Sequence, residues 1–379
     1  MNFELTQEQK MIKEMTQKFA LEELAPESVK RDIEKIWPKE QVSKMADLGL
    51  LGMMVDNQWG GNNLDTISYA IAMEEIAKVD ASAAVIMSVN NSLVCYIFQK
   101  YANDKQKEKY LIPLAKGDKL GCFSLSEPQS GSDASNMAVY AKKDGDDFVI
   151  SGTKNWVTNG INADVIMLFC VTEKGIGHKG ISCFIIDKDT PGLSTGKAEE
   201  KLGIRSSDTC ELYFDQVRVS RENLIGELGD GFKIALSTLD GGRIGIASQA
   251  LGIAQASLEH SVNYSKDRVQ FSKPISNNQI IQFKLADMAM EIEAARLLTH
   301  KAAWQKDKKL NFSASASMAK VYSSEVAMRA STQCVQIHGG YGYIKETGVD
   351  RLMRDAKITQ IYEGTSEIQR VVIARDLLK

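Results

Sequence analysis

The residues between Gly121 and Gly231 carry strand-type patterning, whereas the chain on both sides of them is patterned as helix. Short segments rich in β-branched and aromatic residues, bounded by Gly, Asp or Lys turns, predict strands at 148–151, 165–171, 182–187 and 211–219. In the last of these, the apolar alternation shifts once at Asp215-Gln216, which indicates a β-bulge. The pattern predicts a helical domain at 1–120, a β-domain at 121–231 and a helical bundle at 232–379, which excludes a purely helical or purely β fold.

Proline-free segments with apolar residues three and four apart predict the long helices. They cover 68–78, 81–101, 244–267, 279–306, 313–336 and 366–378. Thr6 followed by Gln9 fits a capping box at the first helix. We interpret Asp240 as the N-cap of the first C-terminal helix, which places Arg243 in the first turn, where the helix dipole prefers acidic residues. That conflict indicates a functional use of the cation.

Composition narrows the functional classes. The formal net charge of −3 does not indicate the basic surface that binds nucleic acid. The six cysteines are scattered without a C-x-x-C pair, which argues against a zinc site or a disulfide framework, and no metal is expected. The chain shows no secretory signal and no apolar run of about 18 residues. We therefore expect a cytoplasmic protein that does not span a membrane.

A carboxylate lies next to a predicted helix start in the segment Ile361-Tyr362-Glu363-Gly364-Thr365-Ser366-Glu367-Ile368-Gln369-Arg370. Thr365 or Ser366 can be the N-cap, and Ser366 with Gln369 fits a capping box. Free N–H groups at such a start favour an anion or an electron-rich cofactor edge, and Gly364 lets a ligand approach the backbone. Glu363 is therefore a candidate base for proton abstraction, while a solvated turn glutamate also fits the local pattern.

Two segments of the predicted β-domain have the chemistry of a cofactor site. A strand end leads into a hydroxyl-rich loop at Phe123-Ser124-Leu125-Ser126-Glu127-Pro128-Gln129-Ser130-Gly131-Ser132-Asp133, which can bond a pyrimidine edge and a pyrophosphate. Trp156-Val157-Thr158 follows a predicted turn at 151–155 and offers an indole face for stacking. An ordinary surface turn and a buried core tryptophan are the alternative interpretations.

Two further segments lie at the ends of predicted C-terminal helices. Arg268-Val269-Gln270-Phe271 and Asn278-Gln279 flank a turn at Pro274, and Arg268 can pair with a pyrophosphate. Gln336-Ile337-His338-Gly339-Gly340 ends a helix with two glycines that allow close backbone approach. Because no G-x-G-x-x-G follows a strand here, this is not a Rossmann fingerprint. We interpret His338 as a packing residue rather than a general base.

In this order, the segments 123–133, 156–158, 268–271, 336–340 and 361–370 resemble the motifs of the acyl-CoA dehydrogenases, FAD enzymes that oxidise the α,β-bond of acyl-CoA thioesters. The resemblance covers nearly the whole chain. It implies an α+β fold with an N-terminal helical domain, a middle β-sheet domain and a C-terminal four-helix bundle. It also implies that Glu363 is the catalytic base and that FAD is the cofactor.

The resemblance assigns further site residues, and it places the FAD site partly across a subunit boundary, so that an oligomer, with a homotetramer as the family expectation, is implied. The implied FAD contacts are Phe123, Leu125, Ser126, Ser132, Trp156, Val157, Thr158, Arg268, Val269, Gln270, Phe271, Asn278, Gln279, Gln336, Ile337, Gly339, Gly340, Thr365, Ser366 and Glu367. The implied substrate contacts are Ser132, Asp240, Gly241, Gly242, Arg243 and Gly364.

The implied reaction converts a short-chain acyl-CoA to the trans-2-enoyl-CoA. Glu363 removes the α-proton, the flavin N5 accepts the β-hydride, and an electron-transferring flavoprotein receives the electrons. Burial of Glu363 against the acyl chain and flavin is expected to raise its pKa. Gly242 departs from the isovaleryl and long-chain branches, which carry their base at that position. The segment 81–90 lacks the cation with which glutaryl-CoA dehydrogenases hold a dicarboxylate, so the resemblance is to the short-chain, butyryl-CoA type.

Other functions of the same chain are considered beside this one. The reaction can run in reverse, as an enoyl-CoA reductase acting on crotonyl-, acrylyl- or an aryl-acrylyl-CoA such as caffeyl-CoA. Oxidases of this superfamily are usually longer chains, and nitroalkane oxidases use an aspartate as base. A non-catalytic flavin or acyl-CoA binding protein would be expected to lose the carboxylate that Glu363 retains.

Overall fold

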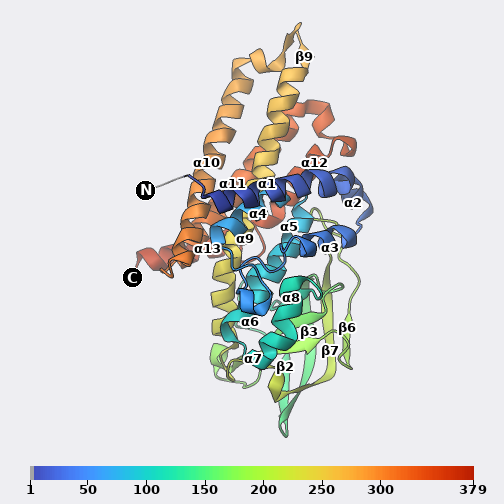
Figure 1. Cartoon of the computed structure of the whole chain (residues 1–379), viewed down its shortest axis with the longest axis vertical. Helices are drawn as coiled ribbons and strands as arrows, with labels where there is room; N and C mark the ends of the chain where they lie inside the picture. The colour runs from blue at the N-terminus through green and yellow to red at the C-terminus, as the bar shows by residue number, and fades with distance from the viewer. Residues whose placement is uncertain (1–3) are drawn as a thin grey trace.

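The computed structural model describes residues 4–379, which form an N-terminal group of helices, a sheet and a C-terminal group of longer helices (Figure 1). This order, predicted from the hydrophobic periodicity, is confirmed. At the first helix the predicted capping box is present, with Thr6 Oγ1 accepting from Gln9 N and the Gln9 side chain accepting from Thr6 N. The N-terminal helices are α1 (Gln7–Phe19), α2 (Ser28–Glu34), α3 (Lys39–Asp47), α4 (Thr66–Val79), α5 (Ala81–Ser88), α6 (Tyr96–Tyr101), α7 (Asp104–Gln106) and α8 (Ile112–Lys116).

The most apolar helix of the N-terminal group runs without a break from α5 through the π-helical segment η4 (Val89–Cys95) into α6, as predicted for 81–101. Ala81–Tyr101 is long and apolar enough to cross a membrane by length and composition, but 94% of its most apolar window is buried inside the protein. Its side chains belong to two hydrophobic cores. Val85 and Leu93 pack in one core, and Ile86 and Met87 pack in the other. A helix that is apolar on all sides is what such two-sided burial requires.

The sheet joins strands from the middle of the chain in the order β6-β7-β3-β2-β4-β5-β8, with β1 pairing β4 in parallel. Alternate residues of β4 point to opposite faces, so Met167 and Phe169 join the core shared with the helices, while Ile166 and Leu168 join the core of the sheet itself. The strands are β1 (Gly121–Ser124), β2 (Tyr140–Asp144), β3 (Asp147–Thr158), β4 (Val165–Val171), β5 (Ile181–Asp187), β6 (Leu193–Thr195), β7 (Thr209–Ser220) and β8 (Leu224–Ile225).

The β3–β7 ladder confirms one prediction and contradicts another. Ile150 pairs with Val217 and Gly152 with Phe214, so two β7 residues oppose one on β3, and the β-bulge predicted at Asp215-Gln216 is confirmed. The turn predicted at 151–155 is wrong, because these residues continue β3. The turn-like composition is overridden by pairing with β7 and by the buried side chain of Lys154.

The C-terminal helices are dominated by α9, whose 37 residues correspond to about 55 Å of helix. Figure 1 shows α9 and α10 extending past the other helices, with β9 at their shared tip. α9 begins at Gly231, so the helix start predicted at Asp240 is wrong, and Arg243 lies in the helix interior. The elements are α9 (Gly231–Asp267), β9 (Val269–Gln270), β10 (Lys273–Pro274), α10 (Gln279–Asp307), α11 (Ser313–His338), α12 (Val349–Thr359) and α13 (Ser366–Leu377).

Candidate active site

Glu363 lies in the link between α12 and α13, in a backbone conformation that a glutamate rarely adopts. Its φ is +50° and that of Gly364 is +91°, so two consecutive residues occupy the left-handed region. Thr365 is the N-cap of α13, and its side chain accepts from Ile368 N. The predicted capping box of Ser366 with Gln369 is wrong, because the Gln369 amide instead donates to the carbonyls of Glu363 and Gly364, at 3.1 and 2.9 Å.

The Glu363 carboxylate lies against α9 at Gly242. A Cβ added to Gly242 would lie 1.9 Å from Glu363 Oε2 and 2.9 Å from Leu93 Cδ2. A glycine inside a helix costs about 1 kcal/mol relative to alanine, and here the missing side chain leaves the space that the carboxylate fills. This contact explains why a glycine at position 242 lies inside α9.

Two cations face this carboxylate, Lys320 from α11 and Arg243 from α9. Oε2 is buried and has no hydrogen-bond partner in the part of the chain that the structure describes. Burial raises the pKa of Glu363 to about 7, and the charges of Lys320 and Arg243 limit the rise. The pKa is raised, as expected for a buried carboxylate oxygen, although Glu363 as a whole is only half-buried.

Arg243 is fixed by polar neighbours rather than by Glu363. Its Nη1 donates to Asp240 Oδ1 at 2.6 Å and to Ser317 Oγ at 3.2 Å. Asp240 also accepts from Ser313 Oγ at 2.9 Å. Asp240 therefore orients the guanidinium from one helical turn away, with both residues inside α9 rather than at its start.

The two cofactor-type segments of the β-domain are adjacent in the structure. Asn155 N donates to Ser126 O at 2.9 Å, and Lys154 Nζ donates to Leu125 O at 2.8 Å. Lys154 also forms a buried ion pair with Glu127 at 2.7 Å, which ties the loop that follows β1 to β3. The structure thus brings the predicted loop at 123–133 beside Trp156 and Thr158.

The segment η4 connects this loop to Glu363. Leu93 contacts α9 at Gly242, and its neighbour Val94 has Cγ1 2.5 Å from the position of a Cβ added to Gly121, the first residue of β1. The carboxylate and the strand that leads into the loop therefore lie on two sides of one helical turn. This arrangement leaves the two predicted parts of the site close to each other.

The residues of this region fit an FAD. Trp156 is 60% exposed and has φ +59°, a strained conformation for a bulky residue, which presents a large apolar ring to the outside of the sheet. Ser124 Oγ and Ser366 Oγ are buried but have no hydrogen-bond partner within residues 4–379. Unpaired hydroxyls and an exposed indole beside a backbone loop are the groups that a flavin ring can bond and stack on.

A second group of predicted FAD residues lies elsewhere. Arg268 and the exposed Phe271 belong to the hairpin at the tip of α9 and α10, and Asn278 precedes α10 (Figure 1). The turn after α11 joins them, because the Arg268 guanidinium lies 5.7 Å from the centre of the Tyr341 ring. A Cβ added to Gly339 or Gly340 would meet nothing within 4 Å. One copy of the chain therefore does not bring this group together with the β-domain loop.

His338 has a packing environment. Its ring stacks on that of Tyr264, with centroids 4.2 Å apart, and its Nδ1 lies 2.8 Å from Cys334 O. Burial lowers the pKa of His338. The interpretation of His338 as a packing residue agrees with these contacts.

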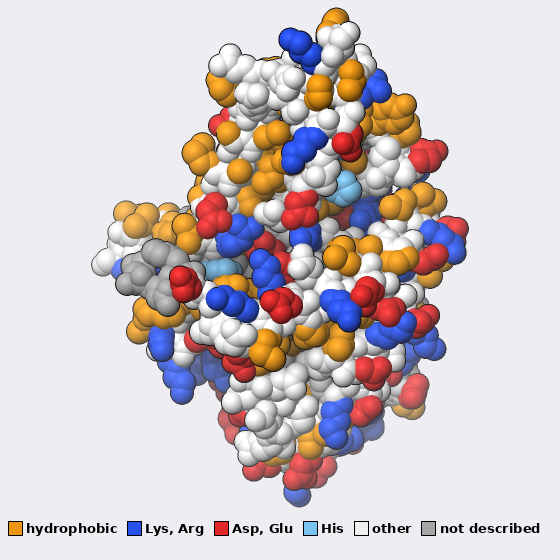
Figure 2. All heavy atoms as spheres, turned by 45° about the horizontal axis from the view of Figure 1, so that its top comes forward, with side chains coloured by type: hydrophobic (Ala, Val, Ile, Leu, Met, Phe, Trp, Pro, Cys, Tyr) orange, Lys and Arg blue, Asp and Glu red, His pale blue; other side chains and the backbone are white. Residues whose placement is uncertain are grey.

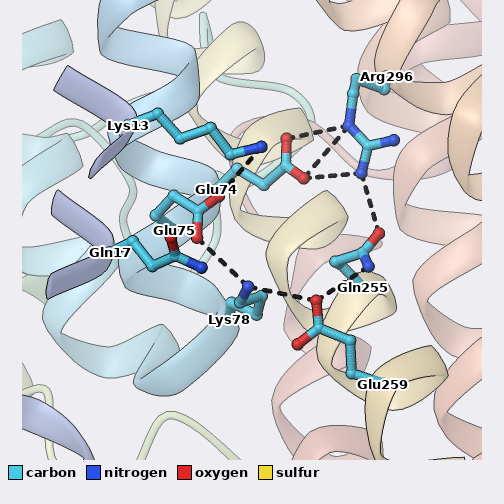
Figure 3. A pocket seen from close by; sticks show the side chains of 8 residues that line it. All are labelled: Lys13, Gln17, Glu74, Glu75, Lys78, Gln255, Glu259 and Arg296. Carbon is cyan, nitrogen blue, oxygen red and sulfur yellow. Dashed lines mark hydrogen bonds and ion pairs between the residues drawn. The ribbon is translucent and has the colours of Figure 1, made fainter. Parts of the chain in front are cut away.

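A separate polar pocket of about 390 Å³ lies between α1, α4, α9 and α10 (Figure 3). Arg296 pairs with Glu74 at 2.8 Å. Lys78 pairs with Glu75 at 3.3 Å and with Glu259 at 3.2 Å. The lining contains no residue predicted for catalysis or cofactor binding, and the mutual pairing of its charges links the helices that surround it.

Two buried lysines of the candidate site were missed in the sequence. Lys320 lies in register with the small buried residues Ala316, Ser323 and Ala327 of α11, and Lys154 occupies an inward position of β3. A lysine in a buried stripe is unusual because an ammonium group is rarely buried without polar partners. The position of each lysine in a stripe of buried residues is the sequence signal that could have identified it.

Comparison with known proteins places the chain among relatives over its whole length. Three family models match it: the N-terminal domain of acyl-CoA dehydrogenase at residues 6–118, the middle domain at 122–217 and the C-terminal domain at 229–378. The chain is 50% identical over 376 residues to the mitochondrial short-chain specific acyl-CoA dehydrogenase of Bos taurus, covering 99% of this chain and 91% of that protein. It is 47% identical over 383 residues to the short-chain specific acyl-CoA dehydrogenase of Megasphaera elsdenii, covering 100% of both.

Solved structures show the same similarity as the sequence comparisons. The butyryl-CoA dehydrogenase of Megasphaera elsdenii superposes with a TM-score of 0.99 at 47% identity, covering 100% of both chains. A structure described as an electron transferring flavoprotein of Acidaminococcus fermentans, in work on flavin-based electron bifurcation, also reaches a TM-score of 0.99, at 46% identity and 100% coverage of both chains.

Proposed function

The chain belongs to the acyl-CoA dehydrogenase family of FAD-binding oxidoreductases, and on that premise we propose that it dehydrogenates a short-chain acyl-CoA with Glu363 as the base. The observation that carries the proposal is the Glu363 carboxylate beside Gly242, whose buried Oε2 has no partner among residues 4–379 and whose pKa is raised to about 7. A base with that pKa is matched to proton transfer near neutral pH.

The chemistry assigned to the protein is proton removal and orientation. The α-proton passes to the Glu363 carboxylate, the β-hydrogen leaves as a hydride, and the α,β double bond forms. FAD, when bound, supplies the hydride acceptor. The N–H of Glu363 donates to the thioester carbonyl oxygen, where negative charge develops. Arg243 favours the ionised form of Glu363 before the proton moves.

A short acyl chain is supported by the packing of α9 next to Glu363. One helical turn beyond Gly242, a Cβ added to Gly245 would lie 2.6 Å from the hydroxyl of Tyr69 and 2.7 Å from Ser88 Oγ. Tyr69 is fully buried and donates to Ser88 at 3.0 Å. We infer that these side chains limit the length of an acyl chain that lies along α9 beyond Gly242. The short-chain specificity of the relatives from Bos taurus and Megasphaera elsdenii supports the same substrate class.

An electron-transferring flavoprotein is the proposed redox partner. The likeness to the Acidaminococcus fermentans structure, described in connection with flavin-based electron bifurcation, also favours a second candidate function. In that function the partner delivers electrons and the protein reduces an enoyl-CoA, with Glu363 returning the α-proton. The base and the site are the same in both directions.

Flavin reduction by a thioester tests the proposal. Anaerobic mixing of the FAD-loaded protein with butyryl-CoA is expected to bleach the flavin absorbance rapidly, because the hydride is transferred without another partner. Bleaching only by bulkier, branched or aryl-propionyl thioesters would contradict the short-chain assignment. Failure of every thioester to reduce the flavin would contradict the enzymatic proposal and favour a binding protein.

The pH dependence follows from the pKa of Glu363. The base acts when ionised, so kcat/KM for butyryl-CoA is expected to fall about tenfold per pH unit below about pH 7 and to level off above it. The measurement is a pH profile of kcat/KM with an artificial electron acceptor. An ordinary glutamate, with a pKa of about 4.3, would give a flat profile between about pH 6 and about pH 8.

A homotetramer completes the proposal. Apolar side chains remain exposed at the end of the molecule that carries the α9–α10 hairpin (Figure 2), including Phe271, which is 97% exposed, and Tyr343, which is 85% exposed. Exposed apolar patches mark interaction surfaces, and a second copy is the occupant that would also bring a distal group of FAD residues to a β-domain loop. Sedimentation velocity of the FAD-loaded protein tests this assembly.

A further inference from the structure

Lys320 is a fully buried lysine that the reaction described above does not use. It lies on α11 with an exposed fraction of 0%, and it forms no ion pair within 4.0 Å in the described part of the chain, residues 4–379. Its Nζ donates to Gly364 O at 2.7 Å. An ammonium group is costly to bury unless its charge and its hydrogen bonds are used. The charge and the hydrogen bond of Lys320 are both directed at Glu363 and Gly364.

The hydrogen bond acts on a strained piece of backbone. Glu363 and Gly364 both have positive φ, and a conformation of this kind persists only where the surroundings impose it. The Gly364 carbonyl accepts from Lys320 and from Gln369, while the Glu363 carbonyl accepts from Gln369 alone. The link is thus held from α11 and α13 at once.

The charge acts on the carboxylate. The charged groups that face Glu363 are Lys320 from α11 and Arg243 from α9. Burial raises the pKa values of Tyr69 on α4 and of Tyr362, and the charge of Glu363 in turn contributes to that rise. The charged groups that face Lys320 are Glu363, Arg243, Glu367 on α13 and Glu325 on α11. Arg243 is already paired with Asp240, whereas Lys320 has only a neutral carbonyl as its partner.

We propose that Lys320 is a positioning residue for the Glu363 base: its ammonium group anchors the Gly364 carbonyl and keeps a positive charge facing the Glu363 carboxylate. The inference depends on the proposed role of Glu363. Anchoring holds the carboxylate where the substrate's α-carbon must lie, and the charge favours the ionised form that accepts the proton.

The sign of the pH effect follows from the charge. Lys320 lowers the pKa of Glu363, so its removal raises that pKa and moves the acid limb of the activity profile to higher pH. Burial lowers the pKa of Lys320 itself to about 7, so the wild-type limb belongs to the coupled pair. A merely structural lysine would change stability or the plateau rate and leave the limb in place.

Stopped-flow reduction of the FAD-loaded protein by butyryl-CoA, measured across pH, tests the proposal. Lys320→Met is expected to move the acid limb to higher pH and to lower the plateau rate about 10- to 100-fold, because both the charge and the anchor are lost. Lys320→Gln retains a donor without the charge, so it should move the limb equally with a smaller loss at the plateau. Gln369→Leu removes neutral donors from the same carbonyls and should lower the plateau without moving the limb.

Lys78→Met provides the matched control, because Lys78 is a largely buried lysine of the pocket in Figure 3 whose partners are Glu75 and Glu259. It should leave both limb and plateau unchanged. An unmoved limb in both Lys320 variants, with FAD content and thermal unfolding like wild type, would overturn the proposal. If Glu363→Gln instead retained normal flavin reduction, the role of Glu363 itself would fail, whatever the Lys320 variants did.

Discussion

Replacing Glu363 by glutamine is expected to slow flavin reduction by butyryl-CoA about 10²- to 10⁴-fold while FAD remains bound. The amide has the shape of the carboxylate but cannot accept the α-proton. Gly242, which lies beside the carboxylate on α9, has no side chain that could replace it as base. The measurement is the rate of bleaching in anaerobic stopped flow, with FAD content determined from the flavin spectrum.

A matched variant separates loss of the base from loss of a buried carboxylate in general. Glu75 is also a buried glutamate whose pKa is raised by burial, and it lies in the polar pocket between α1 and α4 rather than near Glu363. Glu75→Gln should retain rapid bleaching. Near wild-type reduction in Glu363→Gln would sink the assignment of the base.

Adding one methyl group at Gly242 is expected to reduce flavin reduction about 10²-fold without unfolding the protein. The new Cβ would lie 1.9 Å from Glu363 Oε2, well inside contact distance, so the carboxylate must move away from its position beside α9. A displacement of about 1 Å can cost a factor of this size when a reacting group is misplaced. The end of a glutamate side chain is free to move, so folding should be spared.

The stability of Gly242→Ala should change little, in contrast to its activity. Alanine is favoured over glycine inside a helix by about 1 kcal/mol, which offsets the contact with Leu93 at 2.9 Å. Gly241→Ala is the comparison, since its Cβ would meet Lys306 Nζ at 3.5 Å, an ordinary contact, and it should lose far less activity than Gly242→Ala. Thermal unfolding and stopped-flow rates on the same samples give both readings. Equal losses in the two alanine variants would contradict a direct effect on Glu363.

Much of the fold followed from local patterns. The strand predicted at 165–171 coincides with β4, and the bulge at Asp215-Gln216 and the capping box at Thr6 are present. Each depends on residues near one another in the chain: alternation of apolar side chains, a break in that alternation, and a hydroxyl three residues before a glutamine. Such features can be predicted from the sequence because their contacts lie within one element or one pair of strands.

Two of the local predictions that were wrong concern residues whose partners are distant in sequence. Asp240-Gly241-Gly242 has the composition of a helix start, but Glu363 occupies the space beside Gly242. The segment at 151–155 has the composition of a turn, but Lys154 reaches inward to Glu127. In both places a contact between separate elements outweighs a propensity of about 1 kcal/mol.

The sequence by itself determined the order of helices and strands, the family and the position of the candidate carboxylate next to a helix start, since periodicity, caps and motifs are properties of neighbouring residues. Only the tertiary structure decided that Lys320 and Arg243 face Glu363 and that burial brings its pKa to about 7. It also separated the predicted FAD residues into a β-domain group and a distal group near Arg268. The physical reason is that desolvation and charge depend on how α9, α11 and the link before α13 pack together, and that packing joins residues far apart in the chain.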